Sequence, residues 1–152
     1  RRRSDTRFLL TSGLRSFKCQ DVTLLKSLTP AFKILGHLPY EEVLKLYSQS
    51  RAVIVPSLWE EPFGYVVLES MLVETLPIAS KVGGIPEIVD GTPAEDFLFA
   101  PGNVSELTGL MEKVLSMDKE RLYNLGMELR ATVLKRFNPK YIKRRLIQVI
   151  LG

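Results

Sequence analysis

Two glutamates and the glycine between them are the residues of this sequence with the clearest potential for chemistry. Glu61 and Glu69 lie in the segment PSLWEEPFGYVVLESM, residues 56–71, and Gly64 stands between them. We expect a helix to begin near Phe63. Its first backbone amides would lack partners within the helix and, with the positive end of the helix dipole, would favour a diphosphate without any lysine. These amides belong to Phe63, Gly64, Tyr65 and Val66.

The two carboxylates suit hydroxyl groups better than phosphates. Glu69 follows Gly64 by five residues, which is about 7.5 Å along a helix axis. A carboxylate there would repel phosphate and accept hydrogen bonds from hydroxyls such as those of ribose. Glu61, on the loop side of the helix start, could accept from hydroxyls beyond the diphosphate, such as those of a sugar. Alternatively, either glutamate is a solvated surface residue, because such a pair often occurs by chance.

The elements that must position this segment alternate between apolar runs and helical patterns. Short apolar runs predict strands at residues 8–11, 32–35, 52–55, 76–79 and 97–99. Helical spacing and capping residues predict helices at residues 20–28, 41–49 and 63–73, and after Asn103, Asp118 and Asn138. This order predicts an α/β fold: a Rossmann-like, doubly wound, mostly parallel sheet with a helical C-terminal segment. Ligands of such sheets bind at the carboxyl ends of the strands, where residues 56–71 begin.

Composition limits the kinds of site that the chain can hold. Its 152 residues fit a single domain, and they include one cysteine, Cys19, and one histidine, His37. An internal disulfide and a thiolate-rich zinc site are excluded, and no D-x-D pair is present to hold a cation on a diphosphate. We therefore expect no metal ion and no cofactor. The net charge of +4 is spread along the chain, which argues against nucleic acid as a partner.

We expect a cytoplasmic protein. Three other features of the sequence have competing interpretations. No apolar stretch reaches the roughly 18 residues that span a bilayer. Trp59 either lines a ligand cleft or covers the core. A basic cluster near the C-terminus is expected to be a solvated helix face, although anionic lipid or a partner domain is an alternative; it comprises Lys135, Arg136, Lys140, Lys143, Arg144 and Arg145. The apolar residues of the last helix are expected to pack inside rather than against a membrane: Ile142, Leu146, Val149 and Ile150.

The spacing of Glu61 and Glu69 around Pro-Phe-Gly resembles the E-x7-E motif of glycosyltransferases. The resemblance continues in GHLPYEEVLKLYSQSRAVIVPS (36–57), VGGIPEIVDG (82–91), FLFAPGNVSELTGLMEKVL (97–115) and ERLYNLGMELRATVLKRFNPKYI (120–142). Taken together, these segments resemble the C-terminal, donor-binding domain of the retaining, metal-independent GT-B family, the glycosyl transferases group 1. That family includes glycogen synthases and mannosyltransferases.

The resemblance implies a role for each matching residue. Glu69 would bind the ribose of a nucleotide diphosphate sugar. Glu61, the catalytic residue, and the backbone of residues 63–66 would bind the sugar and the diphosphate. His37, Leu38 and Pro39 match the loop that lines the base. The family transfers sugar with retention at the anomeric carbon, and the helix terminus rather than a cation stabilises the diphosphate leaving group. An N-terminal domain or separate subunit would hold the acceptor, so the isolated domain is expected to be inactive.

Several positions depart from the family pattern. Only one strand-helix unit precedes Gly36, where the family normally has two. Either Arg15 and Lys18 are the phosphate-binding pair of the first loop, or residues 8–13 are the second strand and that pair is missing from this chain. Glu74, Leu76 and Asp96 stand where Gly, Pro and Gly are common. These departures leave a second interpretation open, a non-catalytic nucleotide-sugar-binding or assembly module.

Overall fold

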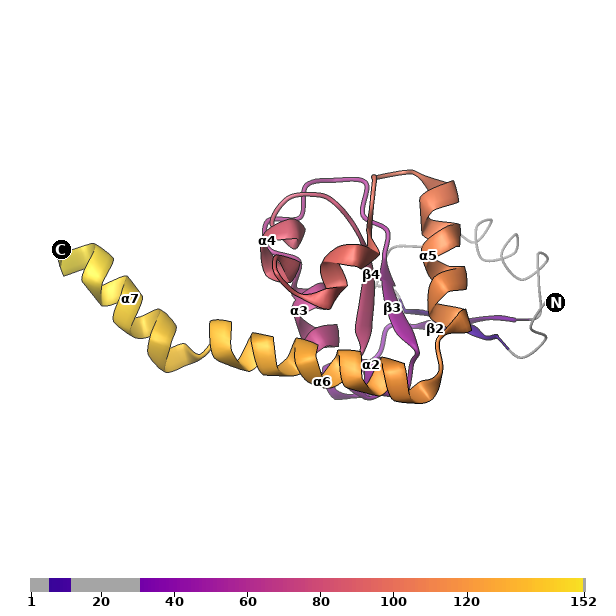
Figure 1. Cartoon of the computed structure of the whole chain (residues 1–152), viewed down its shortest axis with the longest axis horizontal. Coiled ribbons are helices and arrows are strands. Elements are labelled where there is room, and N and C mark those ends of the chain that lie inside the picture. Colours follow the sequence, from indigo (N-terminus) through magenta and orange to yellow (C-terminus); the bar gives the residue numbers. More distant parts are fainter. Residues whose placement is uncertain (1–5, 12–30, 152) are drawn as a thin grey trace. The chain divides into compact units, whose positions relative to one another are not determined.

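The computed structural model describes residues 6–11 and 31–151 of the chain (Figure 1). The chain divides into two compact units, Arg1–Lys45 and Leu46–Gly152, and each is described by itself. Arg15, Lys18 and the helix expected at residues 20–28 lie outside the described residues. The loop of Glu61 and the helix of Glu69 both belong to the second unit.

The first unit contains two parallel strands, β1 (Phe8–Thr11) and β2 (Phe32–Gly36). Their register pairs Phe8 with Phe32, and the two rings stack with their centroids 4.9 Å apart. Both strands were predicted from their apolar runs. The helix α2 (Tyr40–Ser48) follows, within one residue of its expected position at each end.

The second unit contains three parallel strands in the order β3-β4-β5. They are β3 (Ala52–Val55), β4 (Leu76–Ser80) and β5 (Leu98–Phe99). Every residue of the central strand β4 is buried, as expected for a parallel strand covered on both faces. Figure 1 shows α3 and α5 on opposite sides of β4, and both helices pack against this strand. The predicted doubly wound arrangement is therefore confirmed.

The helices of the second unit are α3 (Tyr65–Leu72), α4 (Ile85–Val89), α5 (Val104–Ser116), α6 (Lys119–Arg136) and α7 (Pro139–Leu151), with a 3₁₀ helix η1 (Pro93–Phe97) between α4 and β5. The predicted starts of the three C-terminal helices are confirmed. The side chains of Asn103, Asp118 and Asn138 accept hydrogen bonds from first-turn amides at 3.1, 2.7 and 2.9 Å. A side-chain oxygen at this position satisfies an amide that the helix itself leaves unpaired.

Two short helices were missed in the sequence, and one helix start was misplaced. No helix was predicted between the strands expected at residues 76–79 and 97–99, yet the segment that joins them contains α4 and all but the last residue of η1. Both have proline at the first turn, which helices tolerate because that amide has no partner anyway. Phe97, expected in the last strand, ends η1 instead. The helix α3 begins at Tyr65 rather than Phe63, because Gly64 adopts a left-handed conformation (φ +87°).

The core of the second unit lies between the sheet and the helices α3, α4 and α6. Its large, fully buried side chains include Val67, Met71, Leu76, Ile78, Ile85, Ile88, Val89 and Leu129. Trp59 is 67% exposed, so it does not cover this core.

The prediction that the apolar residues of α7 pack inside is wrong. Ile142, Leu146, Val149 and Ile150 are 45 to 76% exposed, because α7 runs away from the three-stranded sheet of its unit (Figure 1). The expected solvated face is confirmed for four members of the basic cluster, which are exposed: Lys135, Lys140, Lys143 and Arg144. None of the described helices is long and apolar enough to cross a membrane.

Candidate functional site

The N-terminal end of α3 presents amides without partners. Within the described residues, the amides of Gly64, Tyr65 and Val66 donate no hydrogen bond, whereas the amides of Val67 and Leu68 donate to the carbonyl oxygen of Gly64 at 3.0 and 3.3 Å. Tyr65 and Val66 are 68% and 37% exposed. A ligand with negative charge therefore finds free donors at this helix end. The fourth predicted donor, the amide of Phe63, belongs to the loop that precedes the helix.

Gly64 is required by both backbone conformation and packing. Its φ of +87° lies in the left-handed region, where a side chain is strained. A Cβ atom there would also stand 2.8 Å from Cγ1 of Ile85, the first residue of α4. The glycine thus lets α4 pack directly beneath the start of α3. This close approach is a reason for the glycine that sequence reasoning missed.

Glu69 lies on the same helix as the free amides. It is half-buried and follows Tyr65 by four residues in α3, so the two residues lie on the same face of the helix, about one turn apart. Glu69 thus lies on the same face of α3 as the first residue of the helix. Its role at a ribose stays a prediction.

Glu61 sits in the loop between β3 and α3 and has a buried partner. The hydroxyl of Ser57 donates a hydrogen bond to Oε1 of the Glu61 carboxylate at 2.7 Å. Ser57 is only 5% exposed and lies two residues beyond the carboxyl end of β3. Glu61 itself is half-buried. The sequence indicated Glu61 as a site residue but not the serine that holds it.

A two-glycine turn after β4 locks this loop. The amide of Gly84 donates to the carbonyl oxygen of Glu61 at 2.9 Å, and the amide of Gly83 donates to Oε2 of Glu60 at 2.5 Å. A Cβ atom on Gly83 would overlap the carbonyl oxygen of Glu61, and one on Gly84 would lie 2.8 Å from the carbonyl oxygen of Pro62. The two loops therefore interlock backbone against backbone. Sequence reasoning missed this contact, although the pair of successive glycines could have indicated it.

A pocket of about 470 Å³ opens where the two loops meet. It is lined by Glu60, Glu61, Pro62, Phe63, Gly83, Gly84, Glu87, Ile88 and Phe137. The lining therefore carries three carboxylates and two aromatic rings, with no lysine or arginine among its described members. Such a pocket offers acceptors for hydroxyl groups and apolar faces for a ring, and it repels phosphate. Hydroxyls of a neutral polar ligand fit it best.

Phe137 connects this pocket to the end of α6. It is the C-cap residue of that helix, and its ring meets the ring of Phe63 edge to face with centroids 5.8 Å apart. Edge-to-face packing is a favourable geometry for aromatic pairs. Phe137 was not among the predicted site residues, because nothing in its local sequence links it to a loop so distant in the chain.

The other predicted site positions belong to the first unit or lie outside the described residues. His37 and Pro39 are exposed and Leu38 is half-buried; they follow β2 in the first unit, where the carbonyl oxygen of Pro39 accepts from the amides of Glu42 and Val43 at the start of α2. Their role at a base stays a prediction. So does the role at the phosphates of Arg15 and Lys18, which are not in the described part of the chain.

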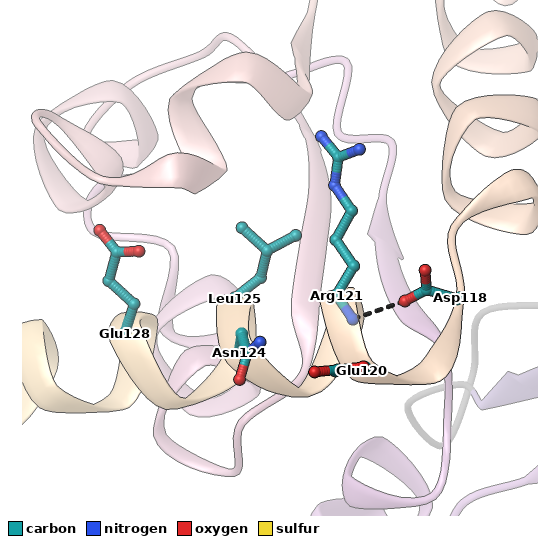
Figure 2. A pocket seen from close by; sticks show the side chains of 6 residues that line it. All are labelled: Asp118, Glu120, Arg121, Asn124, Leu125 and Glu128. Carbon is teal, nitrogen blue, oxygen red and sulfur yellow. Dashed lines mark hydrogen bonds between the residues drawn. The ribbon is translucent and has the colours of Figure 1, made fainter.

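A second pocket, of about 320 Å³, lies along α6 and shares no residue with the first (Figure 2). It is lined by Asp118, Glu120, Arg121, Asn124, Leu125 and Glu128. Figure 2 shows that Asp118 turns back to the amide of Arg121, as a helix cap does. This pocket is a charged helix face.

Across residues 6–11 and 31–151, no group of three or more His, Cys, Asp or Glu could hold a metal ion.

Known proteins resemble this chain over most of its length. The alpha-maltose-1-phosphate synthase of Mycolicibacterium smegmatis is 28% identical over 130 residues, which cover 83% of this chain and 33% of that protein. The structure of HepE from Anabaena in complex with UDP-glucose superposes with a TM-score of 0.76 at 26% identity, covering 95% of this chain and 40% of that one. The sucrose-phosphate synthase of Thermosynechococcus elongatus gives a TM-score of 0.76 at 27% identity, covering 93% and 37%.

The chain therefore spans about a third of the length of the curated relative and somewhat more of the two solved structures. A family model described as Glycosyl transferases group 1 matches residues 12–126, which is more than half of the chain. The matched range includes the Glu61 loop, α3 and the two-glycine turn. By this match and by its α/β fold, which is one half of the GT-B architecture, the chain belongs to the glycosyl transferases group 1 family.

Proposed function

We propose that this chain is the donor-binding part of a glycosyltransferase that moves a sugar from a nucleotide diphosphate sugar to an acceptor. The observation that carries the proposal is the pairing of two environments: free amides at the start of α3, and an acidic, aromatic-lined pocket at Glu61 immediately before them in the chain. The amides suit the diphosphate, and the pocket suits the hydroxyls of the sugar.

This division of the ligand assigns a role to each residue. Because the three carboxylates of the pocket would repel phosphate, the diphosphate lies at the amides of Gly64, Tyr65 and Val66. Glu69, one turn further along α3, accepts hydrogen bonds from the ribose, and Glu61 accepts them from the sugar. His37, Leu38 and Pro39 line the base, and Arg15 and Lys18 add positive charge at the phosphates.

The reaction would proceed with retention at the anomeric carbon and without a metal ion. As the bond between sugar and diphosphate breaks, negative charge grows on the leaving oxygen, and donors already fixed at a helix end stabilise that charge without reorganising. HepE was solved with UDP-glucose bound, which supports a nucleotide sugar as the ligand of this fold. Because the chain spans only part of the length of its relatives, we assign acceptor binding to an N-terminal domain or partner subunit. We expect the protein to act in the cytoplasm.

Isothermal titration tests this proposal directly. The chain is titrated with UDP, GDP and ADP and with the corresponding sugar nucleotides. We expect at least one nucleotide to bind. Glu69→Ala should weaken the binding of the nucleotide and of the sugar nucleotide alike. Glu61→Ala should weaken the binding of the sugar nucleotide more than that of the nucleotide. Exposed Glu95→Ala, remote from α3 in sequence, serves as the matched control. The proposal is wrong if no nucleotide binds the wild-type chain.

A non-catalytic binding or assembly module is the second candidate. It is favoured by Glu74, which adopts a left-handed conformation (φ +64°) where the family commonly has glycine, and by the exposed apolar residues of α7. Size-exclusion chromatography with light scattering separates the candidates. A stable oligomer that binds no nucleotide supports the module.

A further inference from the structure

We propose that Ser57 is a positioning residue: its buried hydroxyl holds the carboxylate of Glu61 in the orientation that receives the donor sugar. This inference rests on the proposed function and extends it to a residue outside the ligand pocket. The hydroxyl of Ser57 donates to Oε1 of Glu61 at 2.7 Å, and Ser57 is not among the residues that line the pocket. It therefore acts on a ligand only through Glu61.

The hydrogen bond has the properties of a fixed, charge-assisted contact. Its length of 2.7 Å is within the range of hydrogen bonds from a hydroxyl to a carboxylate, and such bonds are roughly twice as strong as neutral ones. Ser57 is 5% exposed, so little water competes for its hydroxyl. The bond occupies Oε1, while Oε2 receives no hydrogen bond from the residues that the structure describes. One carboxylate oxygen is thus anchored and the other is left for a ligand.

The backbone of Glu61 is already fixed, so its long side chain is the part of the residue that an anchor can still order. The amide of Gly84 holds the Glu61 carbonyl oxygen at 2.9 Å, and the Gly83 turn packs against the same peptide unit. The remaining freedom is in the side-chain torsions, and ordering a glutamate side chain has an entropic cost. When Ser57 orders the carboxylate in advance, sugar binding no longer bears that cost. Removing the hydroxyl should free the carboxylate and leave the loop in place.

A purely structural role for Ser57 makes a different prediction. If the hydroxyl only stabilised the loop, its loss would also disturb α3, which follows the loop, and nucleotide binding would fall together with sugar binding. The informative quantity is therefore the ratio of the Kd of the nucleotide to the Kd of its sugar nucleotide. This ratio isolates the contribution of the sugar.

Calorimetric titration of the 152-residue chain with UDP and UDP-glucose, GDP and GDP-mannose, and ADP and ADP-glucose measures this ratio. For the pair that binds, we expect Ser57→Ala to lower the ratio roughly tenfold, with the nucleotide Kd changed less than about twofold. Ser57→Cys, which keeps the volume of the side chain but donates weakly, should lower the ratio similarly. Ser57→Thr, which keeps the hydroxyl, should retain the wild-type ratio. Ser70→Ala is the matched control, because Ser70 is buried and donates to the carbonyl oxygen of Val67.

A double-mutant cycle shows whether Ser57 acts through Glu61. In the Glu61→Ala background, Ser57→Ala should change the ratio no further. The inference alone is overturned if wild type distinguishes the sugar nucleotide from the nucleotide and Ser57→Ala leaves the ratio intact, lowers both affinities equally, or acts fully without Glu61. Absence of nucleotide binding by wild type contradicts the proposed function itself, and the inference with it. Circular dichroism of each variant verifies the fold, and Ser57→Cys decides the question if Ser57→Ala does not fold.

Discussion

Gly83→Ala should both destabilise the chain and disable the candidate site. Gly83 has a φ of +50°, and a Cβ atom there would overlap the carbonyl oxygen of Glu61. The left-handed conformation alone costs a side-chain-bearing residue about 1–2 kcal/mol. The overlapping partner is backbone and not a flexible side chain, so the two loops must move apart.

The separation of the loops adds to the cost of the substitution. The hydrogen bond from the Gly84 amide to Glu61 depends on their close approach, and a bond of this kind contributes about 1 kcal/mol. We therefore expect Gly83→Ala to lower the free energy of unfolding by about 2–4 kcal/mol in total. Because the loop that moves carries Glu61, affinity for a sugar nucleotide should fall more steeply than affinity for the nucleotide.

Two other glycines separate strain from overlap. Gly102 has a φ of +77° but only an ordinary contact at 3.8 Å, so Gly102→Ala measures the backbone strain by itself. Gly109 lies inside α5, where an added Cβ atom would meet nothing within 4 Å, so Gly109→Ala should stabilise the helix by about 0.5–1 kcal/mol. Urea unfolding of all three variants gives the comparison. A cost for Gly83→Ala no greater than that for Gly102→Ala would refute the interlocked-loop interpretation.

Three further substitutions test the scaffold by thermal or urea unfolding. Arg51→Ala should lower the free energy of unfolding by about 1–3 kcal/mol, because the Arg51 guanidinium donates to the carbonyl oxygens of Val114 and Met117 at the end of α5; an unchanged stability would contradict that role. Asp118→Ala should cost about 1 kcal/mol through loss of the cap of α6, whereas Asp118→Ser should retain most of it. Glu74→Gly should relieve about 1 kcal/mol of left-handed strain but lose the partly exposed ion pair with Arg130 at 2.9 Å; the gain should therefore be larger in an Arg130→Ala background, and equal gains would show that the pair contributes nothing.

Local sequence signals predicted much of this fold, because their physical causes are local. The runs that form β1 to β4 are rich in apolar residues, and each is followed closely by a glycine, proline or polar residue. Asn103 and Asp118 begin helices because a side-chain oxygen can reach an amide only three residues away. A helix was also expected to begin near Gly64, and it does so two residues later than predicted, at Tyr65.

The features that sequence reasoning missed depend on contacts between distant segments. The role of Gly83 arises only where its turn meets the Glu61 peptide, and Phe137 reaches Phe63 from the far end of α6. The helix α4 has only five residues, too few to show a helical period, so it was not predicted. The apolar residues of α7 have a core-like pattern, yet periodicity cannot say whether the rest of the fold reaches them.

The central claim, that the start of α3 binds a diphosphate, is tested most directly by the amide chemical shifts of the ¹⁵N-labelled chain during titration with UDP, GDP or ADP. At 152 residues the chain is small enough for such spectra. We predict saturable shifts of the Gly64, Tyr65 and Val66 amides, no shift of the Gly109 amide, and no response to the nucleoside without phosphates. Nucleotide binding that leaves these three amides unshifted would contradict the account.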